Sequence, residues 1–560
     1  MKQAGNQILH EADASEPSAV PHDPLVEAAS QLLGVSYLFP YQRLVISNTL
    51  DAARAESEQI SRQIVILPTG AGKSLCFQLP AALLPGCSVV VYPLLSLIAD
   101  QERRLQAGGF EHVVLTGRTA PDSRRDALAA LASGKTRLLL TNPETLAQPA
   151  VVDALKRIAV AHMVVDEAHC VCEWGETFRP AYLELGPTAA AIEPLVLTAF
   201  TATASPYVLQ SIRKHLMLDQ DAHIVAASPD RPNIDYRVIP AAGTTRPLAE
   251  LLGPSAVEDG AAPSPSALGG KPPRLPVERP AIIFCRSRDG TRLIASRLRR
   301  TLRDERIRFY HAGLSSAEKQ RIEQWFFASC DGVLVATCAY GMGVDKPNIR
   351  TVIHPEPAPT VESFLQESGR AGRDGKPAVS ITLAPAFPSS AAAASGSAAD
   401  AGAALQTLQQ MREQAMQQYL TTEGCRREYL LRAMGADSRD CTGCDRCGGV
   451  PRSTPPALQR LREVVIRNRR RFRRAELARL LTGNLVGRDY AAALHLNRSC
   501  GCLAGWEVPD AEDLIEAACA TALLFRRRRG PWRSLLDLRR FAVRSAAPAR
   551  LQTGAETPQT

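Results

Sequence analysis

The sequence predicts an α/β protein with two parallel-sheet domains in tandem, followed by a helical module and a small basic domain. Three observations carry this prediction. Short apolar β-rich runs alternate with helix-length segments between residues 25 and 230, and the alternation restarts after residue 280. A Pro-, Gly-, Ser- and Ala-rich stretch at 241–280 separates the two series and predicts a linker or long surface loop. The length of 560 residues exceeds what one hydrophobic core supports.

Each series contains runs that are apolar throughout, as expected for parallel strands covered by helices on both faces. The first comprises QIVILP (63–68), CSVVVYP (87–93), TRLLLTN (136–142), HMVVDE (162–167) and PLVLTAFTA (194–202). The second comprises AIIFC (281–285), IRFYHAG (307–313), GVLVATC (332–338), RTVIHPE (350–356) and VSITLAP (379–385). Segments between the runs, such as 121–133, predict helices.

These patterns divide the chain into six parts. We expect a disordered tail, a first α/β domain, a second α/β domain containing the insertion 241–280, a helical cysteine-containing module, a basic domain and a final tail. Their ranges are 1–24, 25–230, 231–385, 386–450, 451–540 and 541–560.

Composition and charge narrow the class of protein. Hydrophobic residues make up 45% of the chain and charged residues 22%, as in globular proteins. The net charge is +9, and the blocks RNRRRFRR (467–474) and RRRR (526–529) suit either a polyanion such as nucleic acid or a solvated surface. No stretch resembles a signal peptide or approaches the roughly 18 apolar residues of a membrane span. We expect a cytoplasmic protein without membrane contact, whose 14 cysteines are thiols or metal ligands.

The stretch LPTGAGKS (67–74) predicts a phosphate-binding loop, because it follows an apolar run and precedes a helical segment. Gly70 and Gly72 let backbone N–H groups turn toward phosphates. Lys73 reaches the terminal phosphates, and the Ser74 hydroxyl can ligate Mg²⁺. Leu67 stands where the general pattern has its first glycine.

Two further motifs complete a hydrolysis site. DEAH (166–169) closes an apolar run, so Asp166 can hold a metal through water and Glu167 can deprotonate the attacking water. QESGRAGRDG (366–375) places Arg370 and Arg373 three residues apart, on one face of an expected helix. An arginine that reaches the phosphates from across a cleft contributes roughly 10³–10⁵ in rate.

The order of the motifs resembles that of superfamily two helicases. After the phosphate loop and DEAH come FTATA (200–204), FCRSR (284–288), ATCAYGMGVDKP (336–347) and QESGRAGRDG. HCVCEWGETFRP, DRPN (230–233) and GMGVDKPNIR are similar to signatures of RecQ DNA helicases, over about residues 30–450 and more distantly over 455–535. The resemblance implies two RecA-like domains with ATP between them. It also implies translocation 3′ to 5′ along single-stranded DNA and unwinding of duplex DNA in recombination and repair.

The resemblance also assigns roles at the nucleotide. Gln42 of FPYQ would read the adenine edge. Thr69, Gly70, Gly72, Lys73, Ser74, Asp166, His169 and Gln366 would surround the phosphates and Mg²⁺. The family sandwiches the base between an aromatic residue and an arginine, where this chain has Val35 and Phe39. Tyr37 or Phe39 would stack on the base instead.

Residues for DNA follow from the same resemblance. Those matching the family's DNA contacts are Ser96, Asn142, Thr201, Arg286, Arg288, Thr337 and Lys346, with Thr201 and Thr203 linking nucleotide to DNA. Trp174, Phe178 and Arg179 match the family's aromatic-rich loop, where rings stack on bases of any type. Core packing of these aromatics is the alternative. Glu176 stands where the family has histidine, so an acid there is expected to weaken coupling between DNA and hydrolysis.

Four cysteines have the spacing of a zinc site. Cys425, Cys441, Cys444 and Cys447 form C-x15-C-x2-C-x2-C, which can close a tetrahedron around Zn²⁺, and they match the RecQ zinc module. Packed thiols are the alternative here. For the pairs Cys170–Cys172 and Cys500–Cys502, packing is the favoured interpretation.

The segment 455–535 predicts three helical pieces and then two short strands around Gly530-Pro531. That is the order of a winged-helix domain, which RecQ proteins use to grip duplex DNA. Trp532 and Arg526–Arg529 would then lie on the wing. The expected partners are single-stranded and duplex DNA, with single-strand-binding and recombination proteins. Competing hypotheses are a DNA-dependent ATPase that does not unwind, a binding protein without catalysis, and an RNA helicase.

Overall fold

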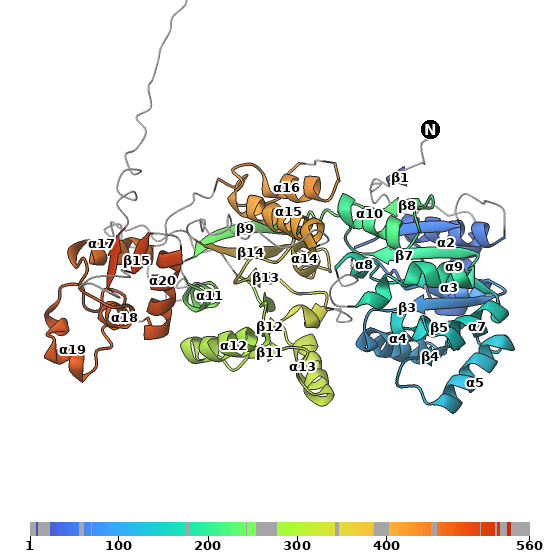
Figure 1. Ribbon diagram of the computed structural model, residues 1–560, viewed down its shortest axis with the longest axis horizontal. Helices are drawn as coiled ribbons and strands as arrows, with labels where there is room; N and C mark the ends of the chain where they lie inside the picture. Colours follow the sequence, from blue (N-terminus) through green and yellow to red (C-terminus); the bar gives the residue numbers. More distant parts are fainter. Residues whose placement is uncertain are drawn as a thin grey trace, which may run out of the picture.

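The computed structural model arranges the chain as three bodies in a row, with a fourth packed on the middle one (Figure 1). It describes residues 7–8, 23–54, 61–68, 70–173, 179–241, 243–253, 277–341, 346–385, 402–437, 440–449, 456–504, 506–520, 523–526 and 535–538. We call the bodies the first lobe (7–8 and 23–227), the second lobe (228–385), the zinc module (402–449) and the C-terminal domain (456–538).

The first lobe is built on a parallel sheet with the strand order β1-β8-β2-β7-β6-β3-β5-β4. Its strands are β1 (Gln7–Ile8), β2 (Arg62–Ile66), β3 (Cys87–Val91), β4 (Val113–Leu115), β5 (Leu138–Thr141), β6 (Val160–Val165), β7 (Val196–Thr201) and β8 (His223–Ala226). The helices around it are α1 (Pro24–Leu33), α2 (Pro40–Ala53), α3 (Leu75–Leu83), α4 (Leu95–Ala107), α5 (Pro121–Ala132), α6 (Pro143–Leu146), α7 (Pro149–Ile158), α8 (Cys170–Glu173), η2 (Pro180–Tyr182), α9 (Leu185–Ile192) and α10 (Pro206–His215). Separate buried clusters pack on the sheet's two faces, which explains why the strands are apolar throughout.

The second lobe repeats this plan with the order β11-β12-β10-β13-β14-β9, again all parallel. Its strands are β9 (Ile234–Ala241), β10 (Ala281–Phe284), β11 (Ile307–Tyr310), β12 (Val333–Ala336), β13 (Thr351–His354) and β14 (Ala378–Pro385). Its helices are α11 (Thr245–Leu252), α12 (Arg288–Leu302), α13 (Ser316–Ala328), η3 (Cys338–Gly341) and α14 (Val361–Ser368). The two lobes confirm the prediction of two parallel-sheet domains.

Two range expectations need correction. The helix α11 lies inside 241–280, so that range was too wide for a linker, because Leu248 and Leu252 pack into the core of the second lobe. The strand β1 lies inside the expected tail 1–24 and pairs in parallel with β8 at the sheet edge. Strands β4, β8 and β9 were not predicted. The first two have only three and four residues, and β9 alternates polar with apolar residues as an edge strand does.

The zinc module contains α15 (Gly402–Thr421) and α16 (Arg426–Ala433), and it packs on the β9–α14 side of the second lobe (Figure 1). The C-terminal domain has α17 (Pro456–Arg467), α18 (Arg474–Thr482), α19 (Gly487–Ala491), η5 (Leu494–Leu496), α20 (Val508–Ala520) and the antiparallel pair β15 (Leu524–Arg526) and β16 (Leu536–Leu538). Helices followed by an antiparallel strand pair are in the order that a winged-helix domain has, but the residues between the two strands lie outside the described residues, and the winged-helix domain stays a prediction. Arg297 and Arg300 of α12 bind Asp513 (3.3 Å) and Glu507 (2.9 Å). Among the described residues, we find no helix with the length and apolar character to cross a membrane.

Candidate nucleotide and nucleic-acid site

Three motifs of the first lobe meet at one edge of its sheet. The strands β2, β7 and β6 are neighbours and parallel, so their carboxyl ends lie side by side. The phosphate loop follows β2, Thr201 ends β7, and Asp166 comes directly after β6. Ligands of parallel α/β sheets bind at this edge. The sheet therefore gathers the phosphate loop, DEAH and FTATA in the place where a nucleotide is expected.

The phosphate loop has the backbone that its glycines were expected to permit. Gly70 and Gly72 have φ values of +88° and +71°, a region that favours glycine. A Cβ on Gly72 would lie 2.5 Å from the amide nitrogen of Gln42. The ammonium of Lys73 lies 3.6 Å from a carboxylate oxygen of Glu167, and among the described residues it is buried without a hydrogen-bond acceptor. Thr69 lies outside the described residues.

The DEAH acids are buried beside cations. Glu167 is 9% exposed and has a φ of +50°, an uncommon backbone conformation that clusters at functional sites. Burial opposes its ionisation, but Lys73, His169 and Arg370 together lower the pKa of Glu167. Burial raises the pKa of Asp166 to about 6, with Lys73 opposing and Glu167 adding to the shift. A bound cation would favour the carboxylate form of Asp166, which fits the Mg²⁺ expectation.

A chain of polar contacts links DEAH to FTATA. The Nδ1 atom of His169 lies 3.3 Å from Glu167 Oε2 and 3.2 Å from Thr201 Oγ1. The Thr201 hydroxyl donates to the carbonyl of Thr203 at 2.9 Å. Thr201 is completely buried, so its side chain offers no surface to DNA in this structure, and its assignment as a DNA contact stays a prediction. Its hydroxyl connects the acids to the segment after β7.

The two arginines of the second lobe reach the same site across the cleft. Arg373 Cδ lies 3.8 Å from the position that a Cβ on Gly70 would occupy. Arg370 is 4% exposed, and its Nε and Nη1 atoms have no hydrogen-bond partner among the described residues. Burial, and then the nearby Arg373, lower the pKa of Arg370 to about 10. A buried cation such as Arg370, two of whose nitrogen atoms lack acceptors among the described residues, fits the phosphates of ATP. Gln366 lies one turn earlier, on α14.

The expectation that both arginines lie on a helix was wrong. The helix α14 ends at Ser368, and residues 369–374 form turns. Gly372 has a φ of +57°, which a regular helix excludes. The i+3 spacing suggested a helix, but the glycines that flank Arg370 and Arg373 let the chain turn there.

The expected adenine side is occupied by aromatic rings. Phe39 stacks on Tyr41 with 5.4 Å between ring centroids, and Tyr37 meets Phe39 edge-on at 5.3 Å. Tyr37 and Phe39 are 60% and 49% exposed, so either can stack on a base, whereas Val35 packs against a buried cluster. Gln42 Nε2 donates to the carbonyl of Ala71 at 3.0 Å, and its Oε1 accepts from the Phe39 amide at 3.0 Å. Base reading by Gln42 stays a prediction.

The side chains that were expected to contact DNA differ in their exposure to solvent. Ser96, Arg286 and Arg288 are exposed, as their predicted role requires. Thr337 is 8% exposed and Lys346 only 2%, so these two side chains offer little surface, and their direct contact with DNA stays a prediction.

Asn142 and Arg179 are held by protein partners. The amide oxygen of Asn142 accepts from Thr145 Oγ1 at 2.6 Å. The guanidinium of Arg179 donates to Glu144 at 2.8 Å and also to the carbonyl of Pro93. Sequence reasoning missed Glu144, although it stands two residues after Asn142. The remaining residues of the aromatic-rich loop (174–178), with Trp174, Glu176 and Phe178, and the wing residues 527–534, with Trp532, lie outside the described residues.

The four predicted zinc ligands come together. The sulfur atoms of Cys425, Cys441, Cys444 and Cys447 all lie within 4.8 Å of one another. Burial opposes the Cys444 thiolate, but backbone N–H groups of Cys447 and Arg426 lower its pKa to about 7. Four thiols at this separation fit a tetrahedral Zn²⁺ ion.

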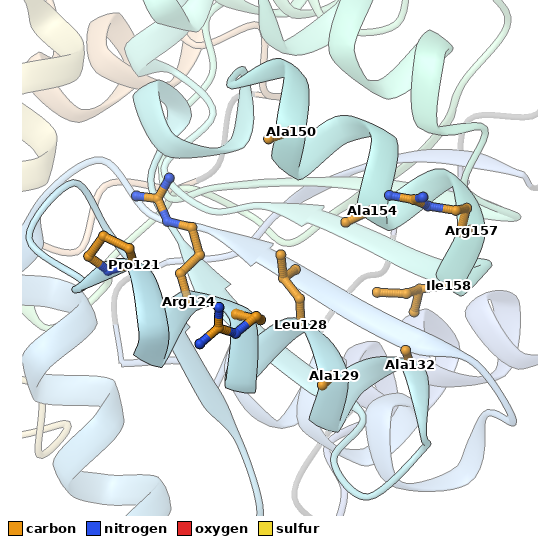
Figure 2. Close-up of a pocket in the computed structure, with 10 residues that line it drawn as sticks. Pro121, Arg124, Leu128, Ala129, Ala132, Ala150, Ala154, Arg157 and Ile158 are labelled. Atoms are coloured by element: carbon orange, nitrogen blue, oxygen red, sulfur yellow. The ribbon is translucent and has the colours of Figure 1, made fainter.

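A groove of about 500 Å³ lies apart from these sites, between α5 and α7 (Figure 2). Arginines line its rim over an apolar floor, and none of the predicted site residues contributes to it. Its lining residues are Pro121, Arg124, Arg125, Leu128, Ala129, Ala132, Ala150, Ala154, Arg157 and Ile158.

Comparison with protein families agrees with this organisation. The family described as DEAD/DEAH box helicase matches residues 39–212, and the helicase conserved C-terminal domain matches residues 276–375. The family described as RecQ zinc-binding matches residues 394–448, which include all four cysteines.

Comparison with curated proteins decides the family. The chain is 30% identical over 453 residues to the ATP-dependent DNA helicase RecQ of Pasteurella multocida, covering 80% of this chain and 67% of that one. The chain belongs to the RecQ family. It is also 38% identical over 321 residues to the probable ATP-dependent DNA helicase RecS of Bacillus subtilis, covering 57% of this chain and 60% of that one. The matched part thus spans about two thirds or less of these RecQ-family relatives.

A solved structure shows the same fold at greater distance. The DUF1998 helicase MrfA bound to DNA matches with a TM-score of 0.50 at 16% identity, covering 93% of this chain and 63% of that one.

Proposed function

We propose that this RecQ-family chain is an ATP hydrolase that works as a 3′ to 5′ DNA helicase in recombination and repair. One observation carries the proposal. Arg370 and Arg373 of the second lobe face Glu167 and the phosphate loop of the first lobe. A site divided between two lobes couples hydrolysis to their relative movement, which is how a helicase steps along a strand.

Each residue has a separate task in this mechanism. Lys73 neutralises the terminal phosphates, and Glu167 orients the attacking water and takes its proton. Arg370 and Arg373 stabilise the charge on the transferring phosphoryl group. Mg²⁺, for which Ser74 and Asp166 offer oxygen ligands, would add charge neutralisation at the phosphates. Zn²⁺ on the four cysteines would stabilise the zinc module.

Single-stranded DNA is proposed to cross the surface that bears Ser96, Arg286 and Arg288, because these side chains are exposed. Arg179 is proposed to join it if DNA displaces Glu144, its ion-pair partner. Duplex DNA would meet the C-terminal domain, and single-strand-binding and recombination proteins are proposed partners. Action in the cytoplasm, at the nucleoid if the protein is bacterial, is part of the proposal.

The test compares the chain with Lys73→Ala. ATP turnover is measured with single-stranded DNA, with RNA and without nucleic acid, and we expect DNA to stimulate it and Lys73→Ala to abolish it. Strand displacement is measured on duplexes with 3′ or 5′ tails, and unwinding is expected only with the 3′ tail. Equal turnover in both proteins would reject the enzyme, and stronger stimulation by RNA would favour an RNA helicase.

A DNA-dependent ATPase that does not unwind is the second candidate. The low exposure of Lys346 and Thr337 supports it, because these two side chains of the second lobe offer little surface to DNA. Hydrolysis stimulated by DNA without strand separation on either tail would support this candidate.

A further inference from the structure

The turn that carries the two catalytic arginines is anchored in the core of the second lobe at its middle, where Ala371 is fully buried and the N–H of Gly372 donates to the carbonyl of Ile349 at 2.8 Å. Because α14 ends at Ser368, no helix fixes Arg370 and Arg373. Both side chains are cations facing the same cleft, and they repel each other. An arginine finger is effective only when its guanidinium is placed accurately before hydrolysis. A group that binds the backbone carbonyls of this turn would steady it further against the repulsion.

We propose that Arg231 is a positioning residue for the two catalytic arginines, and that the zinc module holds Arg231 in place through Arg427. The proposal rests on the proposed ATP hydrolysis. It gives the DRPN segment (230–233) a task of its own, as a brace between the zinc module and the site of hydrolysis.

The first half of the brace is a set of hydrogen bonds to the turn. Arg231 donates to three backbone carbonyls, those of Gly369 (2.9 Å), Ala371 (3.1 Å) and Gly372 (3.0 Å). These carbonyls flank Arg370 on both sides. A planar guanidinium that binds three carbonyls of one turn fixes its shape, because each N–H direction is rigid.

Asn233 strengthens the same contact. Its side-chain amide donates to the carbonyls of Gly372 (2.7 Å) and Lys376 (2.8 Å). A Cβ on Gly372 would lie only 2.4 Å from this amide nitrogen. The turn thus needs glycine at residue 372 for its positive φ and also for its close approach to Asn233.

The second half of the brace comes from the zinc module. Arg427 is 1% exposed, forms an ion pair with Asp230 and donates to the carbonyls of Arg231 (3.0 Å) and Ile234 (2.5 Å). Thr442, between two of the zinc ligands, donates to the carbonyl of Pro232 at 2.6 Å.

The DRPN segment therefore touches the zinc module on one side and the arginine turn on the other. Arg427 follows the zinc ligand Cys425 by two residues. A change in the fold of the zinc module would therefore reach the turn through Arg427 and Arg231. Loss of the brace should misplace Arg370 and Arg373 and leave the phosphate loop intact. Hydrolysis should then slow while nucleotide affinity stays the same.

The experiment measures ATP turnover and nucleotide binding for Arg231→Ala in the full chain. We expect kcat to fall roughly 10- to 100-fold, as for catalytic groups misplaced by about 1 Å. We expect KM for ATP, and the affinity for a non-hydrolysable ATP analogue, to change less than about threefold. Arg231→Lys, which keeps the charge without the planar fork, should recover part of kcat.

Arg237→Ala is the matched control. Arg237 is also a partly buried arginine beside DRPN, on β9, but its side-chain contacts go to Asp235. We expect its kcat to equal that of the unmodified chain. Equal loss in Arg237→Ala and Arg231→Ala would mean that the effect is general destabilisation and would overturn the proposal.

Asp230→Asn tests the zinc-module half without removing a buried arginine. We expect a smaller loss of kcat in the same direction, with unchanged zinc content. In Asp230→Asn with Arg231→Ala, the loss should not exceed that of Arg231→Ala alone, because both act through one contact. If Arg231→Ala does not fold, the proposal is tested with Arg231→Lys and Asp230→Asn instead. If both of these variants have the kcat of the unmodified chain, the proposal is overturned. If the unmodified chain itself does not hydrolyse ATP, the proposed function fails instead.

Discussion

At the scale of single residues, Lys346 shows how burial changes the role of a charge. Its ammonium donates to the carbonyls of Phe327 (3.0 Å) and Ser329 (2.7 Å), where α13 ends, and lies 5.4 Å from the centroid of the Phe326 ring. Burial lowers the pKa of Lys346. A cation at the carboxyl end of a helix satisfies carbonyls that have no partner within the helix. Lys346 therefore stabilises the second lobe.

Lys346→Met should lower stability without lowering DNA affinity. We expect unfolding to require about 1–3 kcal/mol less, because two hydrogen bonds to a charged donor are lost. Denaturant unfolding and binding of single-stranded DNA are measured in parallel. Arg288→Ala is the comparison, because this exposed arginine should lose DNA affinity and keep its stability. Weakened DNA binding by folded Lys346→Met would support the predicted DNA contact instead.

Gly72→Ala tests the contact between the phosphate loop and Gln42. The new Cβ would lie 2.5 Å from the Gln42 amide nitrogen, at a φ of +71° that alanine rarely adopts. We expect affinity for an ATP analogue to fall at least about tenfold, since both the loop and Gln42 must shift. A strain of about 1.4–3 kcal/mol, within the usual cost of such a backbone conformation, corresponds to a loss of roughly 10- to 150-fold. Gly117→Ala, where a Cβ meets nothing within 4 Å, is the control and should bind normally.

At the scale of elements, the basic block 467–474 joins α17 to α18, and its charges are largely paired inside the C-terminal domain. Arg469 and Arg470 bind the carboxylate of Asp537 on β16, at 3.1 Å and 2.7 Å. Arg474 binds Glu516 at 2.7 Å. This block therefore anchors the β15–β16 pair to the helices. Because several of its arginines are paired with carboxylates, fewer positive charges are available for DNA than the sequence suggested.

Asp537→Ala should loosen this anchor. Asp537 is 1% exposed, but its partners Arg469 and Arg470 are 50% and 36% exposed and can be solvated after its loss, so we expect a cost of about 1–3 kcal/mol within the C-terminal domain. Thermal unfolding measures the loss of stability, and limited proteolysis shows whether the C-terminal domain is the part that becomes sensitive to protease. Glu463→Gln, which removes an exposed ion pair with Arg467, should cost less than about 1 kcal/mol. Equal effects of the two substitutions would contradict the anchor.

At the scale of the whole molecule, the zinc module touches both lobes at one junction. Ser205 of the first lobe donates to Glu362 of the second at 2.6 Å, and Arg412 of the zinc module lies 3.7 Å from the same carboxylate. Pro206 lies 3.3 Å from the position of a Cβ on Gly435, in the zinc module. Movement of one lobe against the other must therefore change contacts of the zinc module.

Removal of Zn²⁺ should consequently loosen more than the zinc module. Metal in a four-thiol site contributes on the order of 10–16 kcal/mol to folding. With a chelator we expect residues 402–449 to become sensitive to protease, the melting temperature to fall, and added Zn²⁺ to reverse both. Cys500→Ser should keep its zinc content, because Cys500 packs in the C-terminal core away from the ligands. Zinc bound in normal amount after Cys444→Ser would contradict the assignment.

Much of the fold and part of the site could be predicted because their signals are local. The strand β6 and the acids that follow it are adjacent in sequence, as are the glycines of the phosphate loop and Lys73. The cysteine spacing likewise needs only one turn and one knuckle. Arg231 was present in the DRPN motif, but its contacts with residues 369–372 could not be inferred, since almost 140 positions separate Arg231 from Gly369.

The two parallel α/β lobes, the phosphate loop, the DEAH acids and the zinc ligands could be derived from the order of residues, because each depends on periodicity or spacing within a short segment. The fold was needed to show that Lys346 and Thr201 are buried, that Arg370 and Arg373 lie on a turn, and that Arg427 meets Asp230 from 197 positions away. Burial and ion pairing depend on which distant segments the fold brings together, and a short stretch of sequence carries no record of its distant neighbours.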